Sequence, residues 1–183
     1  AGMTGMSEST TWPSENHDYR IISPMITISR DLILNYCNNS GLEPRIDESN
    51  FSDRHFRNRI RMELIPLMEQ YNPAIRGAFV RLSQNAERDV KFIESQVNEA
   101  WEKVVRHDES YIAFDRTGFI NLPLAIQGHL IRRAIESVKG DLANIDQVHI
   151  DESVSLVNGP AGKSLDLPHN IRTTVSHQLV SIG

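Results

Sequence analysis

The chain has 183 residues, an apolar share of 39%, a single cysteine (Cys37) and a formal net charge of −5 from 19 basic and 24 acidic residues. This charge argues against a protein that binds nucleic acid over its whole surface, and one cysteine excludes both an internal disulfide and a zinc site built from cysteines. No apolar run approaches the roughly 18 residues of a membrane span, so we expect a cytoplasmic protein with no membrane partner.

The N-terminal part predicts one strand and one helix. The first 19 residues are small, polar and turn-forming, which predicts a loop. Tyr19–Ile22 is a short apolar run that stops at Ser23-Pro24 and predicts a strand. Ser29 is a suitable N-cap with Asp31 in the first turn, so a helix is predicted that ends before Gly41.

An acidic turn from Asp47 to Asn50 precedes a predicted helix that carries four arginines. Four of its polar residues follow the i, i+3, i+4, i+7 spacing and share one face: Arg54, Arg57, Asn58 and Arg61. A second, apolar stripe lies about a third of a turn away: Phe56, Ile60, Leu64 and Leu67. We expect the helix to bury the apolar stripe and present the arginines. Taken alone, the arginines are equally well explained as a solvated face or as ion pairs with Asp47, Glu48 and Asp53.

Asn72-Pro73 marks the start of a long helix, with a cap followed by proline at the first helical position. Apolar residues then recur every three or four positions from Ile75 to Val104, which predicts a helix about 50 Å long that links two domains. The polar segment from Arg106 to Ser110 is the predicted domain boundary.

The remaining chain predicts a small α+β domain. A short hairpin is expected over Tyr111–Ile120, followed by a helix from Leu122-Pro123 to Gly140 and a helix capped by Asp146. Three short strands are expected over residues 163–167, 171–175 and 179–182. The fold class is therefore mainly α with small β elements: a helical segment and a long linker helix, followed by a small α+β domain.

Three motifs with a functional appearance have structural explanations. Gly159–Ser164 has two residues between its glycines where a phosphate-binding loop needs four, and it precedes a strand rather than a helix. The seven histidines are scattered singly without an i, i+4 pair, so no metal site is predicted. Asp146 and Asp151 suit helix capping and a solvated face. Lys163 stays a candidate for contact with an RNA phosphate.

Eight ordered positions carry a resemblance to a known family: Asp47, Ser49, Asn50, Arg57, Asn58, Ile60, Arg61 and Pro66. Their spacing resembles tRNA(Ile)-lysidine synthases, in the part that follows the nucleotide-binding core. Gly2-x-x-Gly5-Met6 resembles a stretch late in that family's catalytic domain, and Leu122-Pro123 followed by Arg132 and Arg133 resembles, more weakly, its second, substrate-binding domain. The chain departs from the family at Ser23, where an arginine is usual, and at His169-Asn170, where a glycine pair is common.

The resemblance implies an organisation in three parts. Residues 1–71 would be the C-terminal part of an N-type ATP-pyrophosphatase domain, residues 72–106 a linker helix, and residues 107–183 a tRNA-binding domain. The family's Ser-Gly-Gly-x-Asp-Ser loop is absent from the sequence. We therefore expect a fragment that has no catalytic residue of its own and lacks the part that mainly binds ATP and Mg²⁺.

The activity implied for the intact enzyme is ligation of free lysine to C2 of the wobble cytidine in tRNA(Ile) with a CAU anticodon. ATP would adenylate the base and release pyrophosphate, and the lysine amine would then displace AMP. The resemblance leaves open whether the enzyme is a homodimer.

Within this chain, the residues expected to face tRNA are Arg57, Asn58 and Arg61, with Arg54 and Lys163 as further candidates and with Asp47 and Asn50 shaping the preceding turn. Arginine suits this role because its planar fork binds phosphate oxygens in pairs and stacks on unpaired bases. Two alternatives stay open: a non-catalytic helical RNA-binding module or adaptor, and a structural protein whose arginines form only intramolecular ion pairs.

Overall fold

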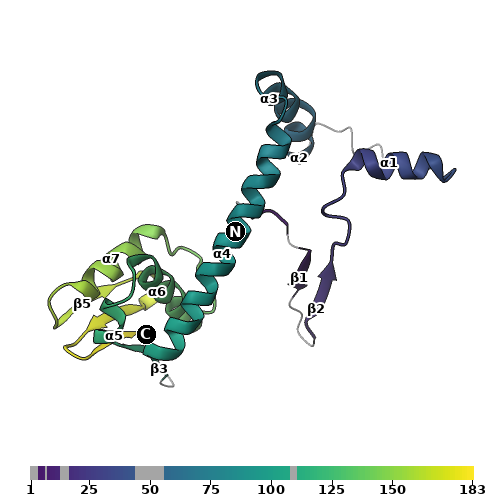
Figure 1. Cartoon of the computed structure of the whole chain (residues 1–183). Helices are drawn as coiled ribbons and strands as arrows, with labels where there is room; N and C mark the ends of the chain where they lie inside the picture. Colours follow the sequence, from purple (N-terminus) through teal and green to yellow (C-terminus); the bar gives the residue numbers. More distant parts are fainter. Residues whose placement is uncertain (1–3, 7, 13–16, 44–55, 108–110) are drawn as a thin grey trace. The chain divides into compact units, whose positions relative to one another are not determined.

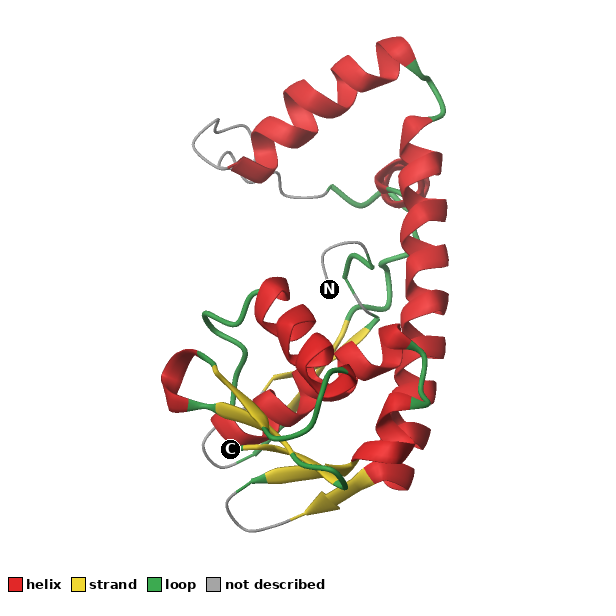
Figure 2. Ribbon diagram, turned by 90° about the vertical axis from the view of Figure 1, so that its left-hand side faces the viewer, coloured by secondary structure: helices red, strands yellow, loops and turns green. Residues whose placement is uncertain are grey.

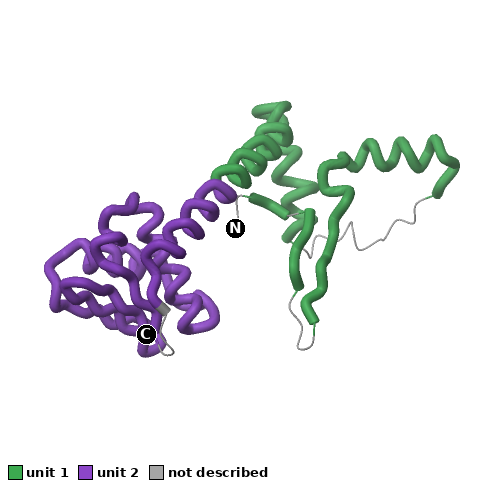
Figure 3. The backbone as a smooth tube through the Cα atoms, turned by 60° about the horizontal axis from the view of Figure 1, so that its bottom comes forward, with its two compact units in different colours: residues 1–89 green, residues 90–183 purple. Residues whose placement is uncertain are grey.

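The computed structural model describes residues 4–6, 8–12, 17–43, 56–107 and 111–183. These residues are mainly helical with small antiparallel sheets, which confirms the predicted fold class (Figure 2). The chain divides into unit 1, residues 1–89, and unit 2, residues 90–183, and each is described by itself (Figure 3). The division lies inside one long helix, α4 (Ile75–Val104) (Figure 1). The domain boundaries inferred from the sequence, after residues 71 and 106, stay predictions.

Unit 1 begins with two antiparallel strands, β1 (Ser9–Trp12) and β2 (Tyr19–Ile22). The strand predicted at Tyr19–Ile22 is confirmed, whereas the loop predicted before it is wrong at Ser9–Trp12. This segment reads Ser-Thr-Thr-Trp, and its β-branched and aromatic residues suit a strand once a partner strand is available.

Helix α1 (Arg30–Asn39) has the ends that the sequence predicts. The Leu32 amide donates to Oγ of Ser29 over 3.3 Å, so Ser29 is the N-cap. Gly41 follows the helix with φ of +66°, a left-handed conformation that glycine adopts without steric cost.

The helix predicted to carry the arginines is a continuous helical run that we call the arginine helix. It consists of α2 (Phe56–Arg59), a π-helical turn η2 (Ile60–Leu64) and α3 (Ile65–Tyr71). In the π-helical turn the Ile65 amide donates to the Ile60 carbonyl, five residues back. The position of Pro66 explains this widening. A proline has no amide hydrogen and its ring collides with the carbonyl four residues earlier, so a wider turn accommodates it.

The apolar stripe of the arginine helix is exposed at three of its four residues, contrary to the expectation, whereas Ile60 is half-buried. Phe56 is 74% exposed, Leu64 47% and Leu67 49%. Among the described residues of unit 1, Ala86 alone is buried. A helical stripe becomes buried only when another element packs against it, and the described part of unit 1 provides no such element for these residues.

Helix α4 confirms the predicted long helix. The Ala74 amide donates to Oδ1 of Asn72 over 3.0 Å at its start, and the helix continues for 30 residues, which is about 45 Å at ~1.5 Å per residue. Its last turns place Val97, Trp101 and Val104 in the core of unit 2.

Unit 2 contains an antiparallel sheet of five strands in the order β3-β4-β7-β6-β5. The strands are β3 (Val105–His107), β4 (Ile112–Asp115), β5 (Lys163–Asp166), β6 (Arg172–Val175) and β7 (Leu179–Ile182). The last three confirm the strands predicted near the end of the chain. Helices α6 (Leu124–Lys139) and α7 (Gln147–Asn158) pack against this sheet.

The hairpin predicted over Tyr111–Ile120 is wrong. β4 is followed by a short helix, α5 (Arg116–Ile120), because Asp115 is its N-cap and accepts a hydrogen bond of 2.7 Å from the Gly118 amide. β4 pairs instead with β3 and β7.

The core of unit 2 is built from large side chains of several elements. Phe114, Phe119, Leu130, Ile135 and Ile182 are fully buried. Burying a side chain of this size contributes about 1.5–3 kcal/mol. The rings of Trp101 and Phe114 meet edge to face at 5.8 Å, so the end of α4 is fixed to the sheet and to α6.

The helix ends in unit 2 follow local signals in the sequence. α6 ends at Gly140 with φ of +93°, the left-handed C-cap that a glycine permits. α7 begins with a reciprocal cap, in which the Asp146 amide donates to Nδ1 of His149 over 3.0 Å and the Asp146 side chain accepts from the His149 amide. The end of α6 at Gly140 and the start of α7 after Asp146 are therefore where the sequence predicts them.

Candidate functional site

The arginine helix presents Arg57 and Arg61 to solvent, and Asn58 is half-buried. Arg59 forms an ion pair of 3.9 Å with Glu63, and both side chains are more than half exposed. Arg61 lies in the π-helical turn, where each residue turns less about the axis than in an α-helix. The regular i, i+4 alignment with Arg57 is therefore altered. Assignment of Arg57, Asn58 and Arg61 to a tRNA-facing surface stays a prediction.

Asp47, Asn50 and Arg54 lie outside the described residues. The acidic turn expected before the arginine helix, and its role in orienting the arginines, therefore also stay predictions.

A bidentate ion pair joins the end of the arginine helix to α4. Arg76 donates from Nε to Oε1 of Glu69 over 2.5 Å and from its terminal nitrogen to Oε2 over 3.1 Å. These hydrogen bonds lower the pKa of Glu69 below its usual value. The pair is exposed to solvent, so its contribution to stability is modest.

Lys163, the candidate in unit 2, is the first residue of β5 and is exposed. It lines a pocket of about 450 Å³ together with Arg172 and His177. Arg172 donates from Nε to Oδ1 of Asp166 over 2.5 Å, and this hydrogen bond raises the pKa of Arg172 above its usual value. The carboxylate partly neutralises the basic character of this pocket.

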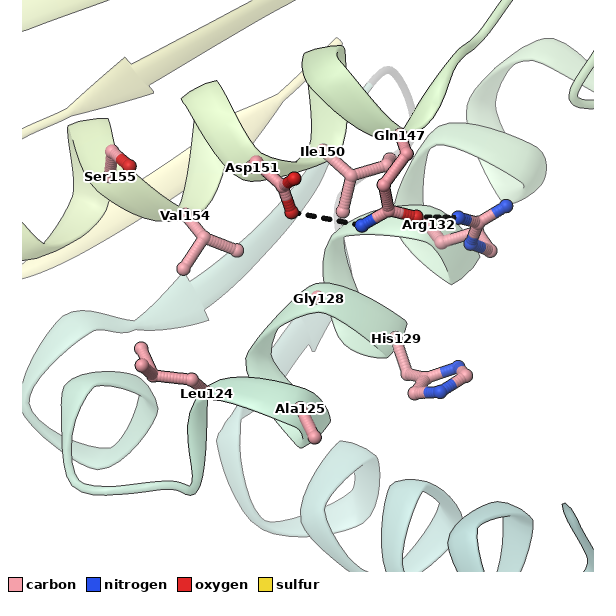
Figure 4. Close-up of a pocket in the computed structure, with 10 residues that line it drawn as sticks. All are labelled: Leu124, Ala125, Gly128, His129, Arg132, Gln147, Ile150, Asp151, Val154 and Ser155. Atoms are coloured by element: carbon pink, nitrogen blue, oxygen red, sulfur yellow. Dashed lines mark hydrogen bonds between the residues drawn. The ribbon is translucent and has the colours of Figure 1, made fainter.

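A larger pocket, of about 550 Å³, lies between α6 and α7 (Figure 4). One end is apolar, with Leu124 and Ala125 of α6 across from Val154 of α7. The other end is polar and contains Arg132 and Gln147.

The polar end contains a chain of hydrogen bonds (Figure 4). Arg132 donates to Oε1 of Gln147 over 2.8 Å, and Nε2 of Gln147 donates to Oδ1 of Asp151 over 2.9 Å. Gln147 was not predicted from the sequence as a site residue, and Asp151 was assigned to a solvated face. The i, i+4 spacing of these two residues on α7 was the available signal.

Arg133 follows Arg132 on α6, but its hydrogen-bond partner lies on α4 instead of α7. It donates to Oδ1 of Asn98 on α4 over 2.7 Å, and its guanidinium carbon lies 4.5 Å from the ring centroid of Trp101, a cation–π contact. A pocket of about 360 Å³ between α4 and α6 contains Asn98, Arg133 and also Arg132.

Within the described residues, no three histidine, cysteine, aspartate or glutamate residues are grouped so that they could hold a metal ion. Gly159–Ser164 leads from the end of α7 into β5, so its amides do not form the helix N-terminus that cradles phosphates. No helix in the described part of the chain is long and apolar enough to cross a membrane.

Comparisons with known proteins give a consistent result. Residues 1–68 match the profile of a PP-loop domain family. The chain is 32% identical over 157 residues to a tRNA(Ile)-lysidine synthase of Clostridioides difficile strain 630, covering 84% of this chain and 34% of the relative. Proteins of the same name from Dehalococcoides mccartyi and Bacillus subtilis strain 168 are 28% and 29% identical over 90% and 87% of this chain, and over 35% and 34% of their own lengths. The chain thus spans about a third of the length of these relatives.

Proposed function

We propose that this chain is part of a tRNA(Ile)-lysidine synthase, an enzyme that ligates lysine to the wobble cytidine of tRNA(Ile). The observation that carries the proposal is the similarity to these synthases over 84–90% of the chain, together with the PP-loop match over residues 1–68. The substrates would be free lysine, ATP and a tRNA(Ile) with a CAU anticodon.

We assign binding of ATP and Mg²⁺ to parts of the enzyme other than the described residues. In this proposal, ATP activates the base as an adenylate and the lysine amine displaces AMP. Unit 1 would belong to the PP-loop domain, and its exposed apolar side chains support this assignment. Phe56, Leu64 and Leu67 are half to three-quarters exposed, and a further part of the same domain would bury them.

The contribution of this chain would be to bind tRNA. Arg57 and Arg61 are exposed, so their guanidinium donors are available to phosphate oxygens and to unpaired anticodon bases. Asn58 lies beside Arg57 and would add a polar contact. Arg54 and Lys163 would add contacts, and Asp47 with Asn50 would shape the turn before the arginine helix. The net charge of −5 confines such contacts to a patch. The proposal does not depend on whether the enzyme is a homodimer.

The test is incorporation of labelled lysine into unmodified tRNA(Ile) transcript by the intact enzyme. Arg57→Ala and Arg61→Ala should each lower kcat/KM by about tenfold or more, the equivalent of ~1.4 kcal/mol, because each removes a charged donor to RNA. Arg59→Ala is the matched control, since Arg59 is paired with Glu63, and it should retain activity.

Wild-type rates in both variants would refute the role of the arginine helix. Failure of the intact wild-type enzyme to attach lysine to the transcript would refute the proposed activity itself. Circular dichroism of each variant checks that the fold is retained.

A further inference from the structure

We propose that Arg132 and Arg133 are a phosphate-binding pair in unit 2, held ready for an RNA backbone by the neutral side-chain amides of Gln147 and Asn98. The proposal rests on the function proposed above and deepens it, because it names the residues of unit 2 that contact the RNA chain.

The two arginines are adjacent on α6 but are fixed by different helices. Arg132 donates to Gln147 of α7 over 2.8 Å, and Arg133 donates to Asn98 of α4 over 2.7 Å. The pockets of about 550 Å³ and 360 Å³ lie on the two sides of this part of α6, and Arg132 lines both. Both side chains are half-buried, and Arg133 lines the smaller pocket together with Arg132.

Both arginines are bound by neutral acceptors. An amide oxygen fixes a guanidinium group without neutralising its charge, whereas a carboxylate does both. Among the described residues, neither Arg132 nor Arg133 has an ion-pair partner within 4.0 Å, although Glu94 and Glu136 line the smaller pocket. Arg76 and Arg172, in contrast, are each bound to a carboxylate. The charges of the α6 pair therefore stay available to an anion.

The orientation of the Gln147 amide is determined by the carboxylate of Asp151, which does not contact Arg132 itself. Nε2 of Gln147 donates to Asp151 over 2.9 Å, so the oxygen of the amide is the end that faces Arg132. Asp151 accordingly orders Arg132 through an intervening amide instead of pairing with it. Gln147 and Asn98 are positioning residues in this scheme.

Trp101 gives Arg133 a rigid support. The indole is 5% exposed and belongs to the core of unit 2, and the Arg133 guanidinium lies over it at 4.5 Å. A guanidinium that is already ordered loses less conformational entropy when it binds. A ligand of linked phosphates suits two ordered forks on one helix, because each fork binds phosphate oxygens in pairs.

The experiment measures binding of the 183-residue chain to fluorescent unmodified tRNA(Ile) transcript by anisotropy, over a series of salt concentrations. Arg132→Gln and Arg133→Gln should each weaken binding about fivefold or more. Each should also lower the slope of log K against log salt by about 0.9, and the double variant by about 1.8, because each lost phosphate contact releases one counterion fewer.

Arg106→Gln is the matched control for loss of charge. Arg106 is exposed on β3 and donates to the carbonyl of its neighbour Val105, so this variant removes one positive charge from unit 2 away from α6. It should change the slope by much less than either α6 variant.

Two further variants separate positioning from structural support. Asn98→Asp and Gln147→Glu keep the shape of each side chain but place a carboxylate against each arginine. Gln147→Glu also replaces the hydrogen bond to Asp151 by a contact between two carboxylates. Both variants should weaken RNA binding as strongly as loss of the arginine, and Asn98→Asp should do so with an unchanged or higher thermal unfolding temperature. If the arginines only support the fold, these variants bind RNA as the wild type does.

Two results would overturn the inference: unchanged affinity and slope in the Arg132→Gln/Arg133→Gln double variant, or no binding by the wild-type chain even at low salt. The first leaves the proposed ligase function intact, because that function is tested by lysine incorporation. If binding behaves as expected but the intact enzyme attaches no lysine, the proposed function fails and the RNA-binding pair stands.

Discussion

At the scale of single residues, two of the three buried polar side chains in the described part of unit 2 differ in their hydrogen bonding. Gln127 is 1% exposed, and its amide group is satisfied: it donates to the Leu122 carbonyl over 2.8 Å and accepts from Asn158 over 2.7 Å. Thr173 on β6 is fully buried, and its Oγ1 has no hydrogen-bond partner among the residues that the structure describes. A buried polar group without a partner costs free energy.

Thr173→Val should therefore raise the free energy of unfolding by about 1–2 kcal/mol, because it replaces an unpaired buried hydroxyl by a methyl group of similar size. The measurement is urea denaturation of the whole chain, followed by circular dichroism. Thr174→Val is the control: Thr174 is the exposed neighbour on the same strand, and its replacement should change stability by less than about 0.5 kcal/mol. Equal effects from the two variants would contradict this explanation.

At the scale of elements, the end of α7 is held by an arginine from another helix. Arg116 at the start of α5 donates to the Val157 carbonyl over 3.2 Å and to the Gly159 carbonyl over 2.6 Å. The last carbonyls of a helix lack partners within it and carry partial negative charge. Arg116 thus caps α7 and fixes its end to α5 and β4.

Arg116→Met should lower the free energy of unfolding of unit 2 by about 1.5–3 kcal/mol, since it removes charge-assisted hydrogen bonds and leaves carbonyls unsatisfied. The loss of unfolding free energy in Arg116→Lys should be smaller than in Arg116→Met, because a lysine keeps the positive charge although it lacks the planar guanidinium fork. Arg106→Met, at an exposed arginine, should change little. Thermal unfolding of the three variants measures these effects. Equal losses of stability in Arg116→Met and Arg106→Met would contradict the role of Arg116 as a cap of α7.

At the scale of the whole molecule, buried apolar side chains are concentrated in unit 2. Apart from Ala86, every buried hydrophobic residue in the described part of the chain lies at or beyond Val97. The first turns of α4 carry exposed apolar residues such as Phe79 and Leu82, whereas its last turns, with Trp101 and Val104, are in the core. One continuous helix therefore passes from a region with little tertiary packing into a packed domain.

Amide hydrogen exchange of the 183-residue chain should follow this distribution. Protection should be highest in α6 and β7 and lowest in α1 and β2. It should also rise along α4 from Ile75 towards Val104, because local opening needs little free energy where few apolar contacts are lost. Mass spectrometry of peptic peptides resolves these segments. Uniform protection along α4 would contradict the expected gradient.

One departure from the expected family pattern lies where the backbone is left-handed. His169 and Asn170 stand where a glycine pair is common, and both have positive φ, of +65° and +61°. Glycine adopts this left-handed conformation without steric cost, and asparagine is among the residues that tolerate it. His169 also contacts Asn144 through its ring at 3.2 Å, a contact that a glycine at this position would lack.

The sequence by itself determined the helix ends at Ser29, Asn72, Gly140 and Asp146, the long helix, the three final strands and the similarity to tRNA(Ile)-lysidine synthases. Caps and periodicity depend on residues within a turn or two of each other, so they can be read without knowing the fold.

Only the tertiary structure decided that Ser9–Trp12 pairs as a strand, that α5 replaces a hairpin and that the apolar stripe of the arginine helix is exposed. It also decided which acceptors hold Arg132 and Arg133. These contacts join residues 15 and 35 positions apart on different helices. No local pattern specifies such pairs, because they form only when α4, α6 and α7 pack around one core.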